Sequence, residues 1–361
     1  MGANRAQRSR RLSGGETVAV RRSLLRWYDR NKRELAWRAH RDPYRIWVAE
    51  VMLQQTRIAV VEPAYRRFLR AFPTMRRLAM AEEEEVVAQW SGLGYYRRAR
   101  ALHRAARILS KEGRRFPRDF DAARKLPGVG PYTAAAVVSI AYGEPHAAVD
   151  GNVVRVLSRL RRLGSPDSRG APYSSMAAEL LDRDRPGDWN EAIMELGETL
   201  CVPVDPPCAR CPLRMHCQAY RAGVVQRYPP VRKSRAPETV ELTMLVLRDR
   251  RGRVLLERGE FRYLPRMWLP VVSPAAARAG SAAAPAGSAD ATAEVRHAIT
   301  HRRFRIRVVV RVVAAASLRR MAAAGRTERR VFDHDEMKGI GRSSLLQKAL
   351  RVGGGRAWAD R

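Results

Sequence analysis

Residues 126–131 read Leu-Pro-Gly-Val-Gly-Pro, and an apolar helical run, Tyr132–Tyr142, follows them directly. Glycine permits the positive φ angles of a tight turn, and proline suits the first turn of a helix. We therefore expect Gly128 and Gly130 to take positive φ in a turn between two helices. Such a turn directs backbone N–H groups toward a phosphate at the helix start without reading base sequence. Taken alone, the motif also fits an ordinary connection between helices.

The chain on both sides of this turn has the periodicity of helices. Apolar residues recur at helical spacing in four further runs, at Val18–Tyr28, Tyr44–Val60, Glu82–Trp90 and Ala99–Leu109. We expect an all-helical domain over residues 17–224. Residues 1–16 are basic, small and polar, which predicts a disordered N-terminus.

All the cysteines of the chain lie close together, in the spacing C-x6-C-x2-C-x5-C, at Cys201, Cys208, Cys211 and Cys217. Prolines interrupt this segment and predict a tight loop. Two disulfides are disfavoured because a chain of 361 residues can form a core without them. A zinc ion also accepts four thiolates, and the spacing does not exclude it. The preferred interpretation is an iron–sulfur cluster bound by the four cysteines.

The composition indicates a polyanionic partner. The chain has 69 Lys+Arg against 36 Asp+Glu, a formal net charge of +33. A charge this large repels itself unless something negative balances it, and nucleic acid is the expected partner. A membrane surface is disfavoured because the sequence has no long apolar span and no signal-peptide core. We expect a monomer in the cytoplasm, of bacterial type and associated with the nucleoid, with its thiols reduced.

The pattern changes after residue 224. Residues 225–238 are rich in proline and arginine and predict a linker. The apolar runs Val240–Leu247 and Val254–Leu256 flank a turn and predict a β-hairpin. Later, Phe304, Ile306, Val308 and Val310 alternate with mostly basic residues, which predicts a strand with one buried face. We expect a smaller α+β domain over residues 239–361, with a flexible low-complexity loop at residues 274–293.

Two carboxylates are candidates for catalysis. Glu50 lies in an otherwise apolar run, IWVAEVML, and Asp150 precedes a helical run. If Glu50 faces inward, desolvation raises its pKa and supplies a general acid near neutral pH. It fits the wet face of an amphipathic helix equally well. Asp150 likewise fits an ordinary helix N-cap. Together the two would suit cleavage of a glycosidic bond, one as the acid for the leaving group and one as the stabiliser of a cationic sugar.

Three motifs, added to the hairpin and the cysteines, carry a family resemblance: EVMLQQT at Glu50–Thr56, GLGYY at Gly92–Tyr96 and DGN at Asp150–Asn152. Together they are similar to the adenine DNA glycosylases of the MutY type, from about Leu35 to Cys217. The resemblance implies a helix-hairpin-helix fold with one 4Fe-4S cluster, and removal of adenine mispaired with 8-oxoguanine or guanine in double-stranded DNA. It implies that Glu50 protonates the adenine ring, that Asp150 stabilises the oxocarbenium-like sugar, and that Asn152 helps to hold that site.

One position separates this family from the related endonuclease III-type enzymes. Those enzymes carry a lysine two residues after the last hairpin glycine, where it forms a Schiff base and cuts the strand. The position is Tyr132 here, and a phenol cannot form an imine with the sugar aldehyde. We therefore expect base removal without an efficient lyase step.

The resemblance also assigns the residues that open the duplex and bind the base. Gln54 and Tyr95 would fill the space beside the lesion as adenine leaves the stack. Leu35, Trp37, Arg38 and Glu191 match positions that line the adenine pocket, although Trp37 and Glu191 also fit ordinary core and helix-surface positions.

The C-terminal domain resembles the Nudix-like domain that these glycosylases use to recognise 8-oxoguanine. It lacks the glutamate-rich helix that holds magnesium in Nudix hydrolases, so nucleotide hydrolysis is not expected. The lesion-reading loop of the family corresponds to Ile299-Thr300-His301, in which the usual aromatic residue is replaced by isoleucine. Thr300 and His301 keep the hydroxyl and the imidazole.

Two alternatives to an adenine glycosylase stay open. One is a mismatch-specific thymine or pyrimidine glycosylase of the same superfamily, since such relatives also lack the lysine. The other is a DNA damage-binding protein without catalysis.

Overall fold

The computed structural model describes residues 13–164, 171–230, 236–259, 261–273, 291–324 and 327–354. It divides into two compact units. The first consists of the described residues up to Met80 and from Ala101 to residue 230. The second consists of Ala81–Arg100 and the described residues from 236 onward. The helical periodicity of residues 81–100 did not separate them from the rest of the predicted helical domain.

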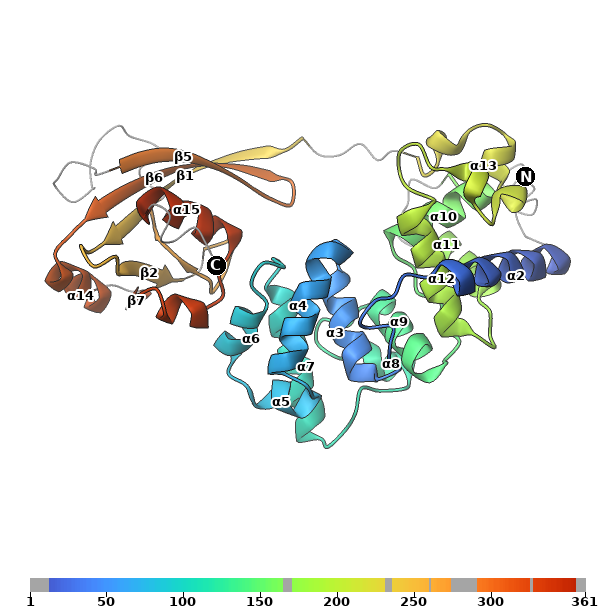
Figure 1. Cartoon of the computed structure of the whole chain (residues 1–361), viewed down its shortest axis with the longest axis horizontal. Helices are drawn as coiled ribbons and strands as arrows, with labels where there is room; N and C mark the ends of the chain where they lie inside the picture. The colour runs from blue at the N-terminus through green and yellow to red at the C-terminus, as the bar shows by residue number, and fades with distance from the viewer. Residues whose placement is uncertain are drawn as a thin grey trace. The chain divides into compact units, whose positions relative to one another are not determined.

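The first unit is helical, as expected (Figure 1). Its helices are α2 (Gly14–Asn31), α3 (Pro43–Leu53), α4 (Ile58–Ala71), α5 (Met75–Met80), α8 (Phe120–Arg124), α9 (Pro131–Tyr142), α10 (Gly151–Arg161), α11 (Ala171–Leu180), α12 (Pro186–Thr199) and α13 (Gln218–Arg221). Helix α7 (Arg97–Lys111) begins in the second unit and continues in the first. Short 3₁₀ turns occupy Cys208–Arg210, Arg214–His216 and Val225–Arg227.

Two boundaries differ from the sequence pattern. Helix α2 starts at Gly14, inside the stretch expected to be disordered, because Ser13 and Glu16 form a reciprocal capping box. The run Tyr44–Val60 is two helices, not one, because α3 ends at Leu53 and Gln55 has a φ of 57°. The expected disorder before Ser13 lies outside the described residues.

The helix-hairpin-helix element is formed by α8, the turn and α9. Gly128 has a φ of 77°, and a Cβ there would lie 2.6 Å from the Cβ of Ala101 on α7, so only glycine fits. Gly130 differs from the expectation: its φ is −85°, and it is the N-cap of α9 in extended conformation. Pro131 starts the helix as predicted. Helix α9 is buried on all sides from Thr133 to Ile140, which explains its uniformly apolar sequence.

The second unit contains α6 (Glu83–Gln89) and a mixed seven-stranded sheet, which confirms the α+β expectation. The strands are β1 (Glu238–Arg248), β2 (Val254–Arg258), β3 (Trp268–Leu269), β4 (Val271–Ser273), β5 (Ala291–Ile299), β6 (Arg302–Val312) and β7 (Glu328–Phe332). The order is β3-β2-β1-β6-β5, with β4 paired to β1 and β7 to β2. Strands β1 and β6 are parallel, and the other pairs are antiparallel.

Helices α14 (Ala315–Ala323) and α15 (Ser344–Gly354) and a 3₁₀ turn, Glu336–Gly339, complete this unit. Phe304, Ile306, Val308 and Val310 of β6 are buried in one apolar cluster with residues of α15, whereas the intervening arginines at 303, 305 and 307 are exposed. The predicted hairpin is β1–β2, turned at Gly252 with a φ of 83°. Most of the predicted low-complexity loop lies outside the described residues, although Ala291–Ala293 begin β5.

Candidate active site

The centre of the candidate site is a hydrogen-bonded pair of side chains from two helices, the buried Glu50 and the half-buried Tyr132. Glu50 of α3 is 4% exposed, and Tyr132 in the first turn of α9 donates a hydrogen bond of 2.8 Å to its Oε2. Of the two orientations that the sequence left open, Glu50 therefore has the inward one. The pKa of Glu50 is raised to about 7. Burial is the largest cause, and the charges of Glu191 and Asp150 add to it, whereas the hydrogen bond from Tyr132 acts in the opposite direction. Burial raises the pKa of Tyr132 well above its usual range, so this phenol stays a neutral donor.

Asp150 is both an N-cap and a member of this site. Its Oδ1 accepts a bond of 2.7 Å from the Val153 N–H, and its Oδ2 accepts one of 3.1 Å from the Asn152 amide. Burial raises the pKa of Asp150, and the hydrogen bonds from Val153 and Asn152 oppose that shift. Because Asp150 affects the pKa of Glu50, the structure brings the two predicted carboxylates within electrostatic range.

Arg38 and Glu191 form part of a larger ion-pair network. Arg38 contacts Glu191 at 3.2 Å and Glu195 at 2.9 Å, and Arg33 contacts Glu195 at 2.6 Å. Burial raises the pKa of Glu191, and the charge of Arg38 opposes that shift. Glu195 and Arg33 were not predicted from the sequence. The two residues are 162 positions apart, so no local sequence pattern indicates that they pair.

The other predicted pocket residues of this unit are Leu35, Trp37 and Gln54. Leu35 and Trp37 are buried, and the Trp37 ring packs edge-on against Tyr65 at 5.5 Å. Gln54 is the C-cap of α3, and its amide donates to Thr133 Oγ1 of α9 at 2.9 Å. Gln54 thus links the two helices that carry Glu50 and Tyr132, whereas Trp37 packs against α4.

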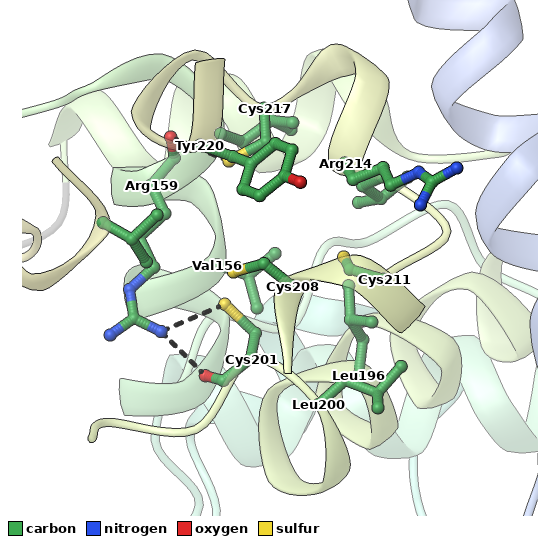
Figure 2. Close-up of a pocket in the computed structure, with 13 residues that line it drawn as sticks. Val156, Arg159, Leu196, Leu200, Cys201, Cys208, Cys211, Arg214, Cys217 and Tyr220 are labelled. Atoms are coloured by element: carbon green, nitrogen blue, oxygen red, sulfur yellow. Dashed lines mark hydrogen bonds between the residues drawn. The ribbon is translucent and has the colours of Figure 1, made fainter. Parts of the chain in front are cut away.

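The four cysteines line one cavity (Figure 2). Its walls are otherwise mainly apolar, formed by Val156, Leu160, Leu196, Leu200, Leu213 and Val225 among others. All four thiols are free of disulfides. Among the described residues no three metal-binding side chains are arranged around a single ion. The cavity and the cysteine spacing are therefore what support a cluster here.

Two arginines of α10 hold the cysteine loop. Arg159 donates to the Cys201 sulfur at 3.4 Å and to the carbonyls of Val202 and Pro203 at 2.7 and 2.9 Å. Arg155 donates to the Cys201 carbonyl at 2.7 Å and to Asn152 Oδ1 at 2.9 Å. Arg155 therefore connects the loop to the amide that holds Asp150. Sequence reasoning missed both arginines, which look like ordinary basic residues of a helix.

The remaining predicted residues lie in the second unit. Tyr95 is 44% exposed with a φ of 47°. Thr300 and His301 form the turn between β5 and β6, where Thr300 has a φ of 55° and its hydroxyl donates to the Ile299 carbonyl at 2.7 Å. The hydroxyl also lies 3.4 Å from His301 Nδ1.

A family comparison identifies the helical unit. Residues 48–174 match the model of the HhH-GPD superfamily base excision DNA repair proteins. The helical unit therefore contains a domain similar to those of the HhH-GPD superfamily. The match covers α9, the hairpin and Glu50, Tyr132, Asp150 and Asn152.

The chain is also similar in sequence to curated adenine DNA glycosylases. The chain is 42% identical over 254 residues to the adenine DNA glycosylase of Rattus norvegicus, covering 67% of this chain and 48% of the relative. It is 41% identical over 236 residues to that of Schizosaccharomyces pombe, covering 59% and 51%. The chain thus spans about half the length of these relatives.

Solved structures of the superfamily have the same fold. A thermostable thymine-DNA glycosylase superimposes with a TM-score of 0.51 at 28% identity, covering 58% of this chain and 98% of that one. An endonuclease III trapped in a covalent intermediate with DNA gives a TM-score of 0.52 at 26% identity, covering 59% and 99%. No helix among the described residues has the length and apolarity needed to cross a bilayer.

Proposed function

We propose that this protein is a monofunctional adenine DNA glycosylase that removes adenine mispaired with 8-oxoguanine or guanine in duplex DNA. The observation that carries the proposal is the buried Glu50, whose pKa of about 7 leaves a large protonated fraction at neutral pH. The similarity to curated adenine DNA glycosylases supports the choice of base.

Glu50 acts as the general acid. Its proton passes to a ring nitrogen of adenine, and the bond between the sugar C1′ and N9 breaks with its electron pair leaving on the neutral base. Without that proton the leaving group would be an anion, which departs far more slowly. The hydrogen bond from Tyr132 fixes Oε2, so the orientation of the carboxyl group is set before substrate binds.

Asp150 stabilises the sugar cation that this cleavage produces. Its carboxylate is fixed by Val153 and Asn152, which leaves its charge available to the developing oxocarbenium ion. Water then adds to C1′ and leaves an abasic site. Tyr132 stands where a Schiff-base lysine would act, so strand cleavage does not follow.

Substrate recognition is assigned to three groups of residues. Leu35, Trp37, Arg38 and Glu191 bind the flipped adenine, and Gln54 and Tyr95 fill the space that it leaves. Gly128 and Gly130 bring the hairpin backbone to a phosphate at the start of α9. In the sheet unit, which we propose is Nudix-like, Thr300 and His301 contact 8-oxoguanine.

We propose further that Cys201, Cys208, Cys211 and Cys217 hold one 4Fe-4S cluster. The residues fit this group because the four thiols line one cavity and Arg159 donates to the sulfur of Cys201. Bound there, the cluster supplies thiolate-ligated iron that shapes the loop. Iron and acid-labile sulfide, each expected at about four per chain, test this assignment, and zinc in their place would reject it.

We also propose that the protein works as a monomer on chromosomal DNA in a reducing compartment, the cytoplasm of a bacterial-type cell. The high net charge of +33 suits a chromosomal partner, and the free thiols suit reduced surroundings.

A thymine glycosylase is the second candidate, favoured by the fold similarity to a thymine-DNA glycosylase. Single-turnover base release from duplexes with A opposite 8-oxoguanine, A opposite G, and T opposite G decides between the two. We expect alkali-dependent breaks at adenine, fastest opposite 8-oxoguanine. Release of thymine would favour the second candidate, and binding without any release would favour a damage-binding protein.

A further inference from the structure

The loop that carries Tyr95 has an unusual backbone. Gly92 and Gly94 have φ angles of 92° and 66°, and Tyr95 itself has a φ of 47°. A left-handed conformation at a bulky residue costs free energy and persists only where neighbouring contacts impose it. The Tyr95 side chain is 44% exposed, so burial of its own ring is not what imposes the conformation.

Part of the support comes from residues next to the loop in the chain. The indole of Trp90 donates to the Gly94 carbonyl at 3.2 Å. Arg98 donates to the Leu93 carbonyl at 3.1 Å, and its guanidinium lies 5.3 Å from the centre of the Tyr95 ring. These contacts fix the middle of the loop.

The two ends of the loop are held by a single distant residue of the same unit. The backbone N–H of Arg342 donates to Ser91 Oγ at 3.0 Å, and the backbone carbonyl of Arg342 accepts from Tyr96 Oη at 2.8 Å. Ser91 and Tyr96 directly bracket residues 92–95. The N–H and C=O groups of one residue, 246 to 251 positions away in sequence, therefore bind both ends of the loop. The Tyr96 hydroxyl also interacts with Ser91 and Gly92.

Close packing holds Arg342 against this segment. A Cβ at the preceding Gly341 would lie 2.3 Å from Cγ1 of Val87 on α6, so the approach requires glycine. Tyr96 is buried, in contrast to Tyr95. Burial raises the pKa of Tyr96 to about 12, so its hydroxyl remains a donor across the physiological range.

A second contact anchors α6 in the same unit. Glu84 accepts a bond of 2.6 Å from the indole of Trp268 on β3 and lies 3.5 Å from Arg258 on β2. Glu83 pairs with Arg266 at 3.1 Å. Two residues of the acidic run Glu82–Glu85, which is unusual in so basic a chain, thus contact arginines and a tryptophan of the sheet region.

We propose that the backbone of Arg342 holds the Ser91–Tyr96 loop in the conformation that presents Tyr95, so that Ser91 and Tyr96 are positioning residues for Tyr95. The sheet unit then contributes to base flipping as well as to lesion reading. This inference rests on the proposed function only where it assigns Tyr95 to base flipping.

Tyr96→Phe is the direct test, because it keeps the ring and removes only the hydroxyl that donates to the Arg342 carbonyl. Since one hydrogen bond is worth roughly 1 kcal/mol, we expect single-turnover release of A opposite G to fall about 5-fold. In a Tyr95→Ala background the same change should have no further effect, because Tyr96 acts through Tyr95. An equal loss in both backgrounds, or no loss in the wild-type background, would overturn the inference.

Tyr44→Phe is a matched control. Tyr44 is also buried and donates a 2.8 Å bond to a backbone carbonyl, that of Phe72, in the helical unit. Any loss that it causes should be equal with and without Tyr95. Ser91→Ala, which removes the other hydrogen bond to Arg342, should reproduce the dependence on Tyr95 seen for Tyr96→Phe.

A measurement without DNA separates this inference from the proposed function. Backbone amides of residues 91–96 should exchange hydrogen several-fold faster in Tyr96→Phe than in the wild type, and Tyr44→Phe should leave them unchanged. Unchanged exchange in Tyr96→Phe would overturn the loop assignment even in an active enzyme. Faster exchange in a protein that releases no base would support the loop assignment and reject only the proposed activity.

Discussion

Tyr132 donates a hydrogen bond of 2.8 Å to Glu50 Oε2, and the Glu50 side chain is buried. The bond connects the first turn of α9, at the helix-hairpin-helix turn, to the last turn of α3. A donor to the carboxylate favours its charged form, whereas burial favours the neutral form. Burial is the larger effect, and Glu50 is left with a pKa of about 7.

Glu50→Gln should abolish base release and leave duplex binding nearly unchanged. Glutamine keeps the shape and can still accept from Tyr132, but it has no proton to give to adenine. Since a positioned general acid contributes about 10²- to 10⁴-fold, we expect a loss of at least that size in single-turnover rate. Glu62→Gln, on the surface of α4, is the control and should have normal activity. Parallel loss of binding and catalysis in Glu50→Gln would contradict the assigned role.

The rate should fall as pH rises through about 7, because only the protonated form of Glu50 can act. In Tyr132→Phe the carboxylate loses a hydrogen bond that stabilises its charged form, so the pKa of Glu50 rises. The alkaline limb of the single-turnover pH profile should therefore move to higher pH. A shift to lower pH, or none, would show that Tyr132 does not act on this carboxyl group.

The raised pKa of Glu50 should also make the free energy of unfolding depend on pH above 4.5. The pKa of Glu50 is raised in the folded state from 4.5 to about 7, so the folded state binds the proton more tightly than the unfolded state. Stability from this group is fully present below pH 4.5 and is lost as the pH rises toward 7. Glutamine does not ionise. The free energy of unfolding, measured by chemical denaturation, should therefore change in favour of Glu50→Gln over wild type as the pH rises from 4.5 to 7. Above that pH the difference between the two proteins should stay constant. A pH-independent difference would refute the raised pKa.

The fold was predictable where the signal is local. The glycines and proline at residues 128–131, the alternation at 304–310 and the cysteine spacing each report on neighbouring residues, and the helices, the strand and the cysteine loop are present at those positions. The orientation of Glu50 was not predictable, because α3 is apolar nearly all round and leaves no wet face to compare.

Residues defined by distant partners escaped sequence reasoning. Glu195 acquires its role from Arg33 and Arg38, more than 150 positions away. Arg155 resembles any helix-surface arginine until α12 and the cysteine loop are placed beside it. The assignment of residues 81–100 to the second unit likewise depends on contacts with residues beyond 250. The acidic run Glu82–Glu85 in a basic chain was the one available signal.

Arg155→Met should weaken both the fold and the chemistry. Its guanidinium donates hydrogen bonds to the carbonyls of Gly197 and Cys201 and to Asn152 Oδ1. Methionine would leave all three acceptors without that donor. We expect a loss of about 2 kcal/mol in the free energy of unfolding. Base release should also slow, because Asn152 is the amide that holds Asp150. Arg26→Met, at an exposed position of α2, controls for loss of a charge and should change neither quantity.

Thr300→Val tests whether the β5–β6 turn reads the lesion. Valine keeps the branched shape of threonine at this left-handed position and removes only the hydroxyl. If that hydroxyl contacts 8-oxoguanine, single-turnover release of adenine opposite 8-oxoguanine should fall about 5-fold, the value of one hydrogen bond. Release opposite guanine should be unchanged, because guanine lacks the 8-oxo group. Thr239→Val, on the exposed part of β1, should alter neither rate. Equal slowing on both duplexes would mean that Thr300 only shapes the turn, through its bond to the Ile299 carbonyl.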